Sequence, residues 1–140
     1  ENLIMQDANL KPQALHDIKN KYSILYFFKP DCPHCKEETP KLLNFYNMKK
    51  FDCEVYAVCS DSSLVEMRNY IKELDLKWIT VNGPRNYVGS YHDLYDAIFT
   101  PTLYVLDRQK KIIGKKIPAE KLEEFLTQYE RLEKMRNKKS

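Results

Sequence analysis

Two cysteines three positions apart, Cys32 and Cys35, are the sequence feature that most constrains the fold. They follow an apolar and aromatic run over 23–28, which is typical of a buried β-strand. After a short break, Pro33 opens a long amphipathic segment, which predicts a helix over 33–50. At this spacing both sulfurs lie on one side of the helix and can close a small disulfide ring. The free N–H groups and the dipole of a helix N-terminus favour a thiolate at Cys32.

The length and composition predict one globular domain. A chain of 140 residues with 43% apolar and 12% aromatic residues can build a single core, and it does not have the composition of a disordered chain. Its longest apolar run, 24–28, is too short to span a membrane. We therefore expect one domain over 1–140, with its core at about 10–132. Because the first residues show neither an initiator Met nor a leader, we expect the C-terminal part of a longer protein.

The net charge of +3 comes from the end of the chain. Four basic residues stand without an acid in the last seven positions, and the rest of the chain is nearly neutral. This pattern favours a solvated helix end over a tail that binds nucleic acid or anionic lipid. We expect no nucleic-acid partner.

The rest of the chain predicts an α/β sandwich. A strand, a helix and a second strand in succession imply a parallel, right-handed crossover. Ser63 and Glu66 fit a capping box at the start of the second long helix, and Pro40 should bend the first one. We expect a three-layer sandwich, with a mixed central sheet flanked by helices. The further elements predicted are helices at 12–20, 64–74, 91–98 and 119–135, strands at 54–59 and 77–81, a loop at 82–90, and a hairpin from 102–107 and 111–116.

The cysteine pair could serve either redox chemistry or a metal. Structural zinc uses four ligands, usually as two close pairs. Cys53 and Cys59 are instead six positions apart along one predicted strand, and the histidines, His16, His34 and His92, form no ligand pair. This favours a redox pair, with no metal and no organic cofactor. Cys53 and Cys59 are most simply buried core thiols, because the ends of one strand are too far apart for a disulfide.

In the redox interpretation the two cysteines have different roles. Cys32 is the nucleophile, because it lies nearest the exposed helix end, and Cys35 resolves the mixed disulfide. His34 can stabilise the Cys32 thiolate and so make the disulfide more oxidising, or it can be an exposed residue without a role. Pro101 precedes a predicted strand. It is either an ordinary proline at a strand entrance or a cis proline that turns the backbone at Thr100 toward the sulfurs.

The stretch 29–40 (Lys-Pro-Asp-Cys-Pro-His-Cys-Lys-Glu-Glu-Thr-Pro), followed later by Thr100-Pro101-Thr102, Leu-Asp and a hairpin, resembles the thioredoxin superfamily. It is most similar to the TlpA/ResA-like branch of extracytoplasmic thiol–disulfide oxidoreductases, over about 10–132. The resemblance implies that Cys32 attacks and Cys35 resolves. It also implies that a cis-proline loop at Thr100–Pro101, together with Pro33, lines the substrate groove, and that Glu38 is the active-site carboxylate that tunes the thiols.

The same resemblance implies a function. We expect an enzyme that exchanges the Cys32–Cys35 pair with protein thiols and disulfides and with an upstream redox partner. We further expect a periplasmic or other extracytoplasmic setting, a monomer, and any membrane tether outside residues 1–140. The alternatives are a binding or adaptor module, and a metal-binding domain that uses the Cys-Pro-His-Cys motif.

Two departures from the family pattern leave the direction of electron flow open. Many relatives have Trp where this chain has Asp31, and a negative neighbour opposes thiolate formation. General thioredoxins carry an acid in the preceding strand, where this chain has Tyr26. Pro-His between the cysteines is similar to strongly oxidising proteins, whereas many proteins with the TlpA-like framework are reductants.

Overall fold

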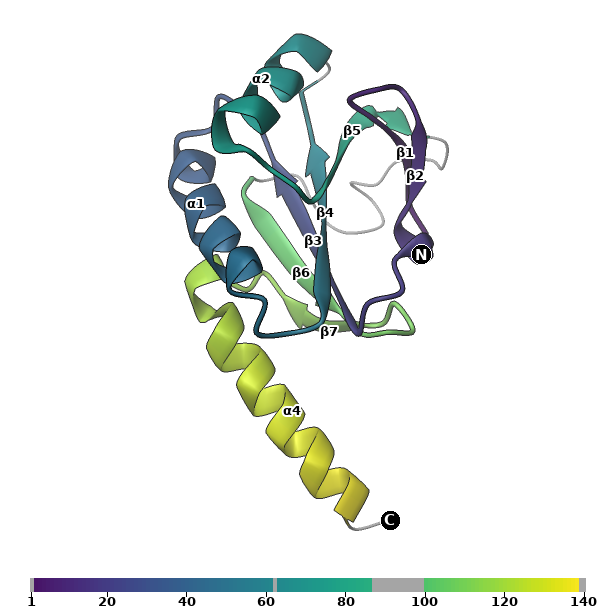
Figure 1. Ribbon diagram of the computed structural model, residues 1–140, viewed down its shortest axis with the longest axis vertical. Coiled ribbons are helices and arrows are strands. Elements are labelled where there is room, and N and C mark those ends of the chain that lie inside the picture. Colours follow the sequence, from purple (N-terminus) through teal and green to yellow (C-terminus); the bar gives the residue numbers. More distant parts are fainter. Residues whose placement is uncertain (1, 62, 87–99, 139–140) are drawn as a thin grey trace.

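The computed structural model describes residues 2–61, 63–86 and 100–138, which form a mixed β-sheet flanked by helices (Figure 1). In these residues the sheet has seven strands in the order β2-β1-β5-β4-β3-β6-β7. This arrangement confirms the predicted α/β sandwich around a mixed sheet. The strands are β1 (Ile4–Asp7), β2 (Pro12–Ala14), β3 (Tyr22–Phe28), β4 (Cys53–Cys59), β5 (Ile79–Asn86), β6 (Thr102–Leu106) and β7 (Ile112–Lys115). The helices are α1 (Pro33–Met48), α2 (Leu64–Leu74) and α4 (Leu122–Lys138), with short 3₁₀ helices η1 (Leu15–Asp17) and η2 (Ala119–Lys121).

The centre of the sheet has the predicted strand–helix–strand–helix–strand order. β3 lies parallel to β4, with Phe28 opposite Cys59, and β4 lies parallel to β5. Parallel neighbours need crossover connections, which α1 and α2 supply. β6 lies antiparallel to β3 and forms a hairpin with β7. The carboxyl end of β3, which leads to Cys32, therefore lies between the end of β4 and the start of β6.

Apolar side chains pack on both faces of the sheet. On one face, alternate residues of β3 and β4 pack against buried side chains of α1, α2 and α4. On the other face, Leu25, Phe27 and Tyr56 pack against N-terminal residues that include Leu3 and Leu15. β3 is buried along its whole length, as expected for a central strand covered on both sides. Each fully buried side chain of this kind contributes roughly 1.5–3 kcal/mol of stability.

The N-terminal segment forms a hairpin, so the helix predicted over 12–20 is wrong except for one 3₁₀ turn at η1. β1 and β2 pair antiparallel. The Asp7 side chain accepts hydrogen bonds from the backbone N–H groups of Asn9 and Lys11, at 2.8 and 3.0 Å, and these bonds hold the turn. Pro12 lacks an N–H, so it suits an edge strand as well as a first helical turn, and the sequence pattern does not separate these two cases.

β5 continues past the strand predicted over 77–81 into the first part of the loop predicted over 82–90. The added residues pair with β1, where Asn82 lies opposite Gln6, and the register of this pairing is irregular. Pro84 and a neighbouring glycine suggest a loop because they weaken an isolated strand. The partner strand β1, which has little pattern of its own, provides the pairing that keeps this segment extended.

The helices predicted over 33–50, 64–74 and 119–135 are confirmed, with small shifts at their ends. The Ser63 side chain accepts the N–H of Glu66 at 3.2 Å, as the predicted cap requires. Asp61, rather than Glu66, completes this cap by accepting the N–H of Ser63 at 2.9 Å. α1 continues through Pro40 as one helix. The helix predicted over 91–98 lies outside the described residues.

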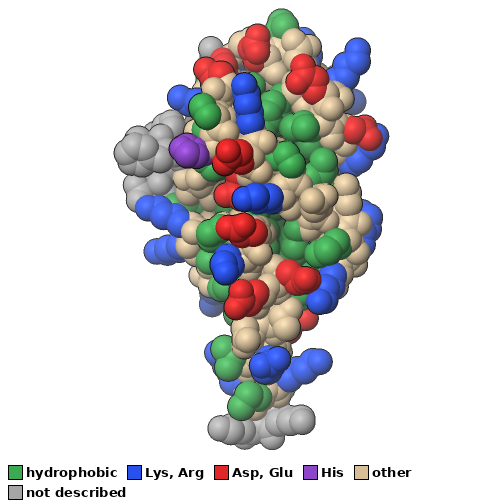
Figure 2. Space-filling model, turned by 90° about the vertical axis from the view of Figure 1, so that its left-hand side faces the viewer, with side chains coloured by type: hydrophobic (Ala, Val, Ile, Leu, Met, Phe, Trp, Pro, Cys, Tyr) green, Lys and Arg blue, Asp and Glu red, His purple; other side chains and the backbone are tan. Residues whose placement is uncertain are grey.

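The outer surface of the helices carries charges of both signs. Figure 2 shows Lys, Arg, Asp and Glu side chains interspersed over the side of the molecule where α1 and α2 lie. α4 begins against the core, where Leu122 and Leu126 are fully buried. It then runs away from the sheet (Figure 1), and Leu132 and Met135 near its end are more than half exposed.

Candidate active site

Cys32 and Cys35 lie where β3 leads into α1. Cys32 is the N-cap residue of α1, with an extended backbone, and Pro33 follows in the first turn, where a missing N–H costs no helical hydrogen bond. The backbone N–H of Cys35 donates to the Cys32 Sγ at 3.3 Å. The sulfur of Cys32 thus occupies the capping position that a Ser or Asp oxygen usually fills. Both cysteines are free thiols in this structure.

The two thiols have opposite environments. Burial raises the pKa of half-buried Cys32, but hydrogen bonds from the Cys35 thiol, the Thr100 side chain and the backbone N–H groups of Cys35 and His34 lower it more, so the pKa falls below its ordinary value. Cys35 is fully buried. Burial, and then its hydrogen bond to Cys32, raise the pKa of Cys35 to about 12. Cys32 is therefore the thiol that ionises first.

The Thr100–Pro101 loop lies against Cys32. The Cys32 Sγ lies 3.6 Å from the Thr100 carbonyl oxygen, and the Thr100–Pro101 peptide bond is cis. The loop reaches this place because Thr102, at the start of β6, pairs with Phe27 near the end of β3. Two segments far apart in the sequence therefore meet at the sulfur.

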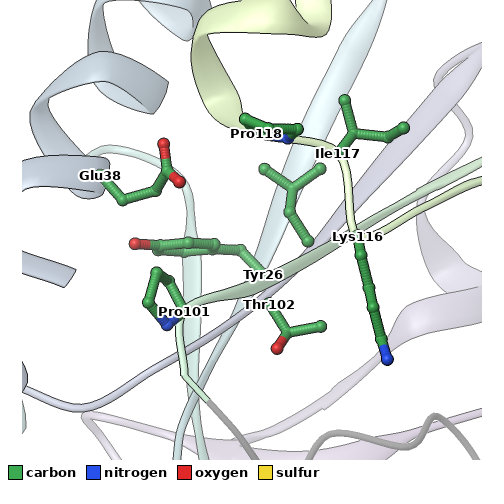
Figure 3. Close-up of a pocket in the computed structure, with 8 residues that line it drawn as sticks. Tyr26, Glu38, Pro101, Thr102, Lys116, Ile117 and Pro118 are labelled. Carbon is green, nitrogen blue, oxygen red and sulfur yellow. The ribbon is translucent and has the colours of Figure 1, made fainter. Parts of the chain in front are cut away.

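A pocket of about 400 Å³ adjoins this loop. Its walls are Tyr26 of β3, Glu38 of α1, the start of β6 at Pro101, and the segment 116–118 after β7. Figure 3 shows the Tyr26 ring lying between Glu38 and Pro101, with Lys116 on the far side of the pocket. The pocket thus places a carboxylate, a phenol and the proline loop around one space.

Glu38 is half-buried, and it links α1 to the start of η2. Its Oε1 accepts the backbone N–H of Ala119 at 3.1 Å, where the unpaired N–H groups of a helical turn favour a negative charge. Because Glu38 lies three residues after Cys35 on α1, both side chains belong to the same part of the helix. The carboxylate therefore stands at the pocket wall on the side of α1.

His34 and Pro33, two further predicted site residues, have exposed side chains. The contribution of His34 to the low pKa of Cys32 comes from its backbone N–H, after larger contributions from Cys35 and Thr100. The structure therefore brings together Cys32, Cys35, Thr100, Pro101 and Glu38, and it leaves the imidazole of His34 and the ring of Pro33 at the surface beside them.

Three buried hydroxyl groups that were not predicted from the sequence lie beneath Cys35. Thr39 and Tyr26 share a hydrogen bond of 2.8 Å, and the Tyr70 hydroxyl donates to the Thr39 Oγ1 at 2.7 Å. The Tyr70 hydroxyl also lies 3.4 Å from the Cys35 carbonyl oxygen. Thr39 follows Cys35 by one helical turn, so its place on the inner face of α1 could have been predicted. The two tyrosines come from β3 and α2, and no local pattern links them.

The other two cysteines lie at the ends of β4. Burial raises the pKa of Cys53 to about 11, with smaller contributions from the nearby acids Glu54 and Asp52. Burial raises the pKa of Cys59 to about 11 as well. Cys59 is fully buried and Cys53 is half-buried. Both thiols are therefore protonated at neutral pH.

The described part of the chain contains neither a metal-ligand cluster nor a membrane-spanning helix. No three His, Cys, Asp or Glu side chains among these residues come together as ligands for a metal ion. No helix among the same residues is long and apolar enough to cross a membrane.

Known proteins match this chain over most of its length. The sequence profile of the AhpC/TSA family matches residues 1–115. A thiol-disulfide oxidoreductase ResA of Bacillus cereus is 27% identical over 130 residues, which cover 91% of this chain and 72% of that protein. A domain of a possible thiol-disulfide isomerase from Cytophaga hutchinsonii superposes with a TM-score of 0.87 at 37% identity, covering 96% of this chain and 92% of that one. The thioredoxin domain of a thiol-disulfide oxidoreductase from Bacteroides vulgatus has a similar fold, with a TM-score of 0.77 at 23% identity over 92% of this chain and 93% of that one.

The fold, the cysteine pair and these relatives define a thioredoxin-like thiol–disulfide oxidoreductase. The chain belongs to the AhpC/TSA family, and its named relatives include ResA proteins. The predicted thioredoxin-like fold and ResA-like character are thereby confirmed.

Proposed function

We propose that this domain exchanges a Cys32–Cys35 dithiol or disulfide with protein substrates in an extracytoplasmic compartment. In the reducing direction, the Cys32 thiolate attacks a substrate disulfide, forms a mixed disulfide and releases one substrate thiol. The Cys35 sulfur then attacks the Cys32 sulfur, so that the second substrate thiol leaves and the Cys32–Cys35 disulfide forms. The oxidising direction is the reverse sequence of steps.

The observation that carries this proposal is the opposite character of two thiols within one helical turn. Cys32 is accessible and has a lowered pKa, whereas Cys35 is fully buried with a pKa of about 12. An accessible thiolate can attack a large substrate. A buried thiol cannot reach a protein in solution, but once it loses its proton it can attack its own neighbour.

Other residues have supporting roles in the proposed reaction. The Thr100–Pro101 loop, which contacts Cys32, and the exposed Pro33 form the surface on which a substrate chain lies. Glu38, which lines the pocket, takes up the proton of Cys35. His34, at the exposed end of α1, adds a polar side chain next to the nucleophile.

The direction of electron flow follows from the midpoint potential of the pair. A glutathione redox titration of Cys32–Cys35 measures this potential. Known motifs of this type span roughly −120 to −270 mV. A midpoint near the first value makes the domain a disulfide donor, and a midpoint near the second makes it a reductant.

The compartment and the upstream redox partner are the parts of the proposal supported by the resemblance to the TlpA/ResA-like branch. Fractionation of cells that express the full-length protein tests the compartment. Recovery in the cytoplasmic fraction with a fully reduced Cys32–Cys35 pair would contradict it.

Reduction of insulin disulfides tests the exchange reaction. We expect the wild type to be active, Cys32→Ser to lose at least about 100-fold of its rate, and Cys35→Ser to accumulate a mixed disulfide at Cys32. Cys53→Ser is the matched control, since it removes a thiol outside the site, and we expect its rate to stay within about twofold. Equal rates for the wild type and Cys32→Ser would contradict the proposal and would favour a binding or adaptor role.

A further inference from the structure

A chain of three hydroxyl groups runs beneath Cys35 and joins three elements of the fold. Tyr70 of α2 donates to Thr39 of α1 at 2.7 Å, and Thr39 shares a hydrogen bond of 2.8 Å with Tyr26 of β3. All three residues are at least nine-tenths buried. Buried polar groups cost stability unless they are paired, and a fully connected network fixes one geometry.

The hydrogens of this network can be counted. Each of the three hydroxyls has one hydrogen. The Tyr70 hydrogen lies closer to Thr39, at 2.7 Å, than to the Cys35 carbonyl, at 3.4 Å, which favours donation to Thr39. Either atom of the Thr39–Tyr26 pair can be the donor, so Thr39 can then donate to the Tyr26 oxygen. In this arrangement the hydrogen of Tyr26 is not used within the network. Tyr26 is also the member of the network that lines the pocket, between Glu38 and Pro101 (Figure 3).

The network is anchored at the turn that carries Cys35. Thr39 follows Cys35 by one helical turn, and the Tyr70 hydroxyl lies 3.4 Å from the Cys35 carbonyl oxygen. Cys35 must become an anion to attack, yet its thiol is fully buried. A hydroxyl hydrogen that can turn toward a buried sulfur stabilises such an anion without placing a second charge in the core.

We propose that Tyr26, oriented by Thr39 and Tyr70, is a positioning residue for the resolving step: it donates its hydroxyl hydrogen to stabilise Cys35 as that thiol ionises and attacks Cys32. This inference rests on the proposed exchange function and adds a role to a residue that has none in it.

Atoms and electrons balance in the proposed step. Cys35 gives its proton to the Glu38 carboxylate, and the Tyr26 hydrogen bonds to the forming thiolate. The Cys35 sulfur forms a bond to the Cys32 sulfur, and the bond from Cys32 to the substrate sulfur breaks. Glu38 gives this proton to the departing substrate thiolate and so becomes a carboxylate again. The two cysteines are oxidised by two electrons, and the substrate disulfide is reduced by two.

The titratable groups around Cys35 agree with this assignment. Cys32, on the same turn, acts on Cys35 directly, and Cys35 in turn acts on Tyr26 of β3 and Tyr70 of α2. Glu38 of α1 acts on Tyr26, Cys59 of β4 acts on Tyr70, and Asp31 acts on Cys59. Burial comes first among the causes that raise the pKa of Tyr26 and that of Tyr70, the latter to about 12. Both phenols therefore stay neutral and remain hydrogen donors at physiological pH.

A two-phase reaction with the aromatic disulfide dithiobis(nitrobenzoate), with the reduced protein in excess, tests this inference. Attack by Cys32 releases one coloured thiol in a phase that depends on protein concentration. Resolution by Cys35 releases a second in a phase that does not. We expect Tyr26→Phe and Tyr70→Phe to slow only the second phase, Tyr26→Phe by about tenfold at neutral pH, and to move its pH midpoint upward by about one unit, since a tenfold change corresponds to one pKa unit.

Tyr56→Phe is the matched control. Tyr56 is equally buried, lies in the neighbouring strand on the opposite face, and donates its hydroxyl hydrogen to the Gln13 carbonyl at 2.8 Å. We expect it to leave both phases within about twofold, and Thr39→Ser to retain the wild-type second phase. An unchanged second phase and pH profile in both Tyr26→Phe and Tyr70→Phe would overturn the inference, as would an equal effect of Tyr56→Phe. Absence of the second phase in the wild type would instead contradict the proposed function itself.

Discussion

The chain contains two pairs of cysteines, and they differ in position and in environment. Cys32 and Cys35 lie on one helical turn, whereas Cys53 and Cys59 lie at opposite ends of β4. Burial acts on all four thiols in the direction that raises the pKa, and at Cys35, Cys53 and Cys59 the pKa is raised. Only at Cys32 do hydrogen bonds outweigh it. A helix N-terminus with directed N–H groups therefore activates a thiol, whereas a strand end beside acidic residues does not.

The largest effect that this comparison predicts is in alkylation. A thiol with a pKa of about 11 is ionised to roughly one part in 10⁴ at pH 7, and an ordinary thiol to about one part in 10². We therefore expect iodoacetamide to modify Cys32 at least about 100-fold faster than Cys53 or Cys59 in the reduced, folded protein. Mass spectrometry of digested time points measures each rate. Similar rates at Cys32 and Cys53 would remove the difference between the pairs, and unfolding in urea should abolish the preference.

The next effect is on stability at alkaline pH. The raised pKa of Cys59 contributes stability that is fully present below the unfolded value of 9.0 and is lost as pH rises toward the folded value of about 11. The lowered pKa of Cys32 acts in the opposite sense, since its contribution is present above the unfolded value and is lost as pH falls through the folded value. We expect the stability difference between the wild type and Cys59→Ser to shrink by about 1 kcal/mol between pH 8 and pH 10.

Urea unfolding of the reduced protein at pH 8, 9 and 10 measures this change. Taking the difference between two variants cancels the titration of lysines and tyrosines, which both share. A constant difference across this range would show that Cys59 ionises in the folded protein as easily as in the unfolded chain.

The smallest effect concerns His34. Its imidazole is exposed, and the contact that lowers the pKa of Cys32 is made by its backbone N–H, which alanine retains. We expect His34→Ala to change the alkylation rate of Cys32 by less than about threefold. His16→Ala, which removes another exposed histidine, is the control and should have no effect. A loss of more than tenfold in His34→Ala would make the imidazole the main stabiliser of the thiolate.

The predictions made from sequence succeed where the signal is local. The strand at 23–28, the helix that begins at Pro33 and the cap at Ser63 each depend on neighbouring residues, and the structure contains all three. In the hairpin of β1 and β2, only the turn held by the Asp7 side chain is a local signal. The hairpin was not predicted because β1 is kept extended by pairing with β5, which is far away in the sequence.

The candidate site shows the same division between local and distant signals. Cys32, Cys35 and Glu38 follow from spacing along one helix. The link between Tyr26 and Tyr70 was not predictable, because it passes through Thr39, which is 13 residues from one and 31 from the other. Only the packing of β3, α1 and α2 brings these hydroxyls together.

The most direct test of the account is a pH titration of thiolate absorbance, near about 240 nm, in the reduced protein. We expect one thiolate to form below pH 9, this signal to disappear in Cys32→Ser, and the signal to persist in Cys35→Ser and Cys59→Ser. A wild-type protein with no thiolate below pH 9, or a signal that survives in Cys32→Ser, would contradict the claim that Cys32 is the activated thiol.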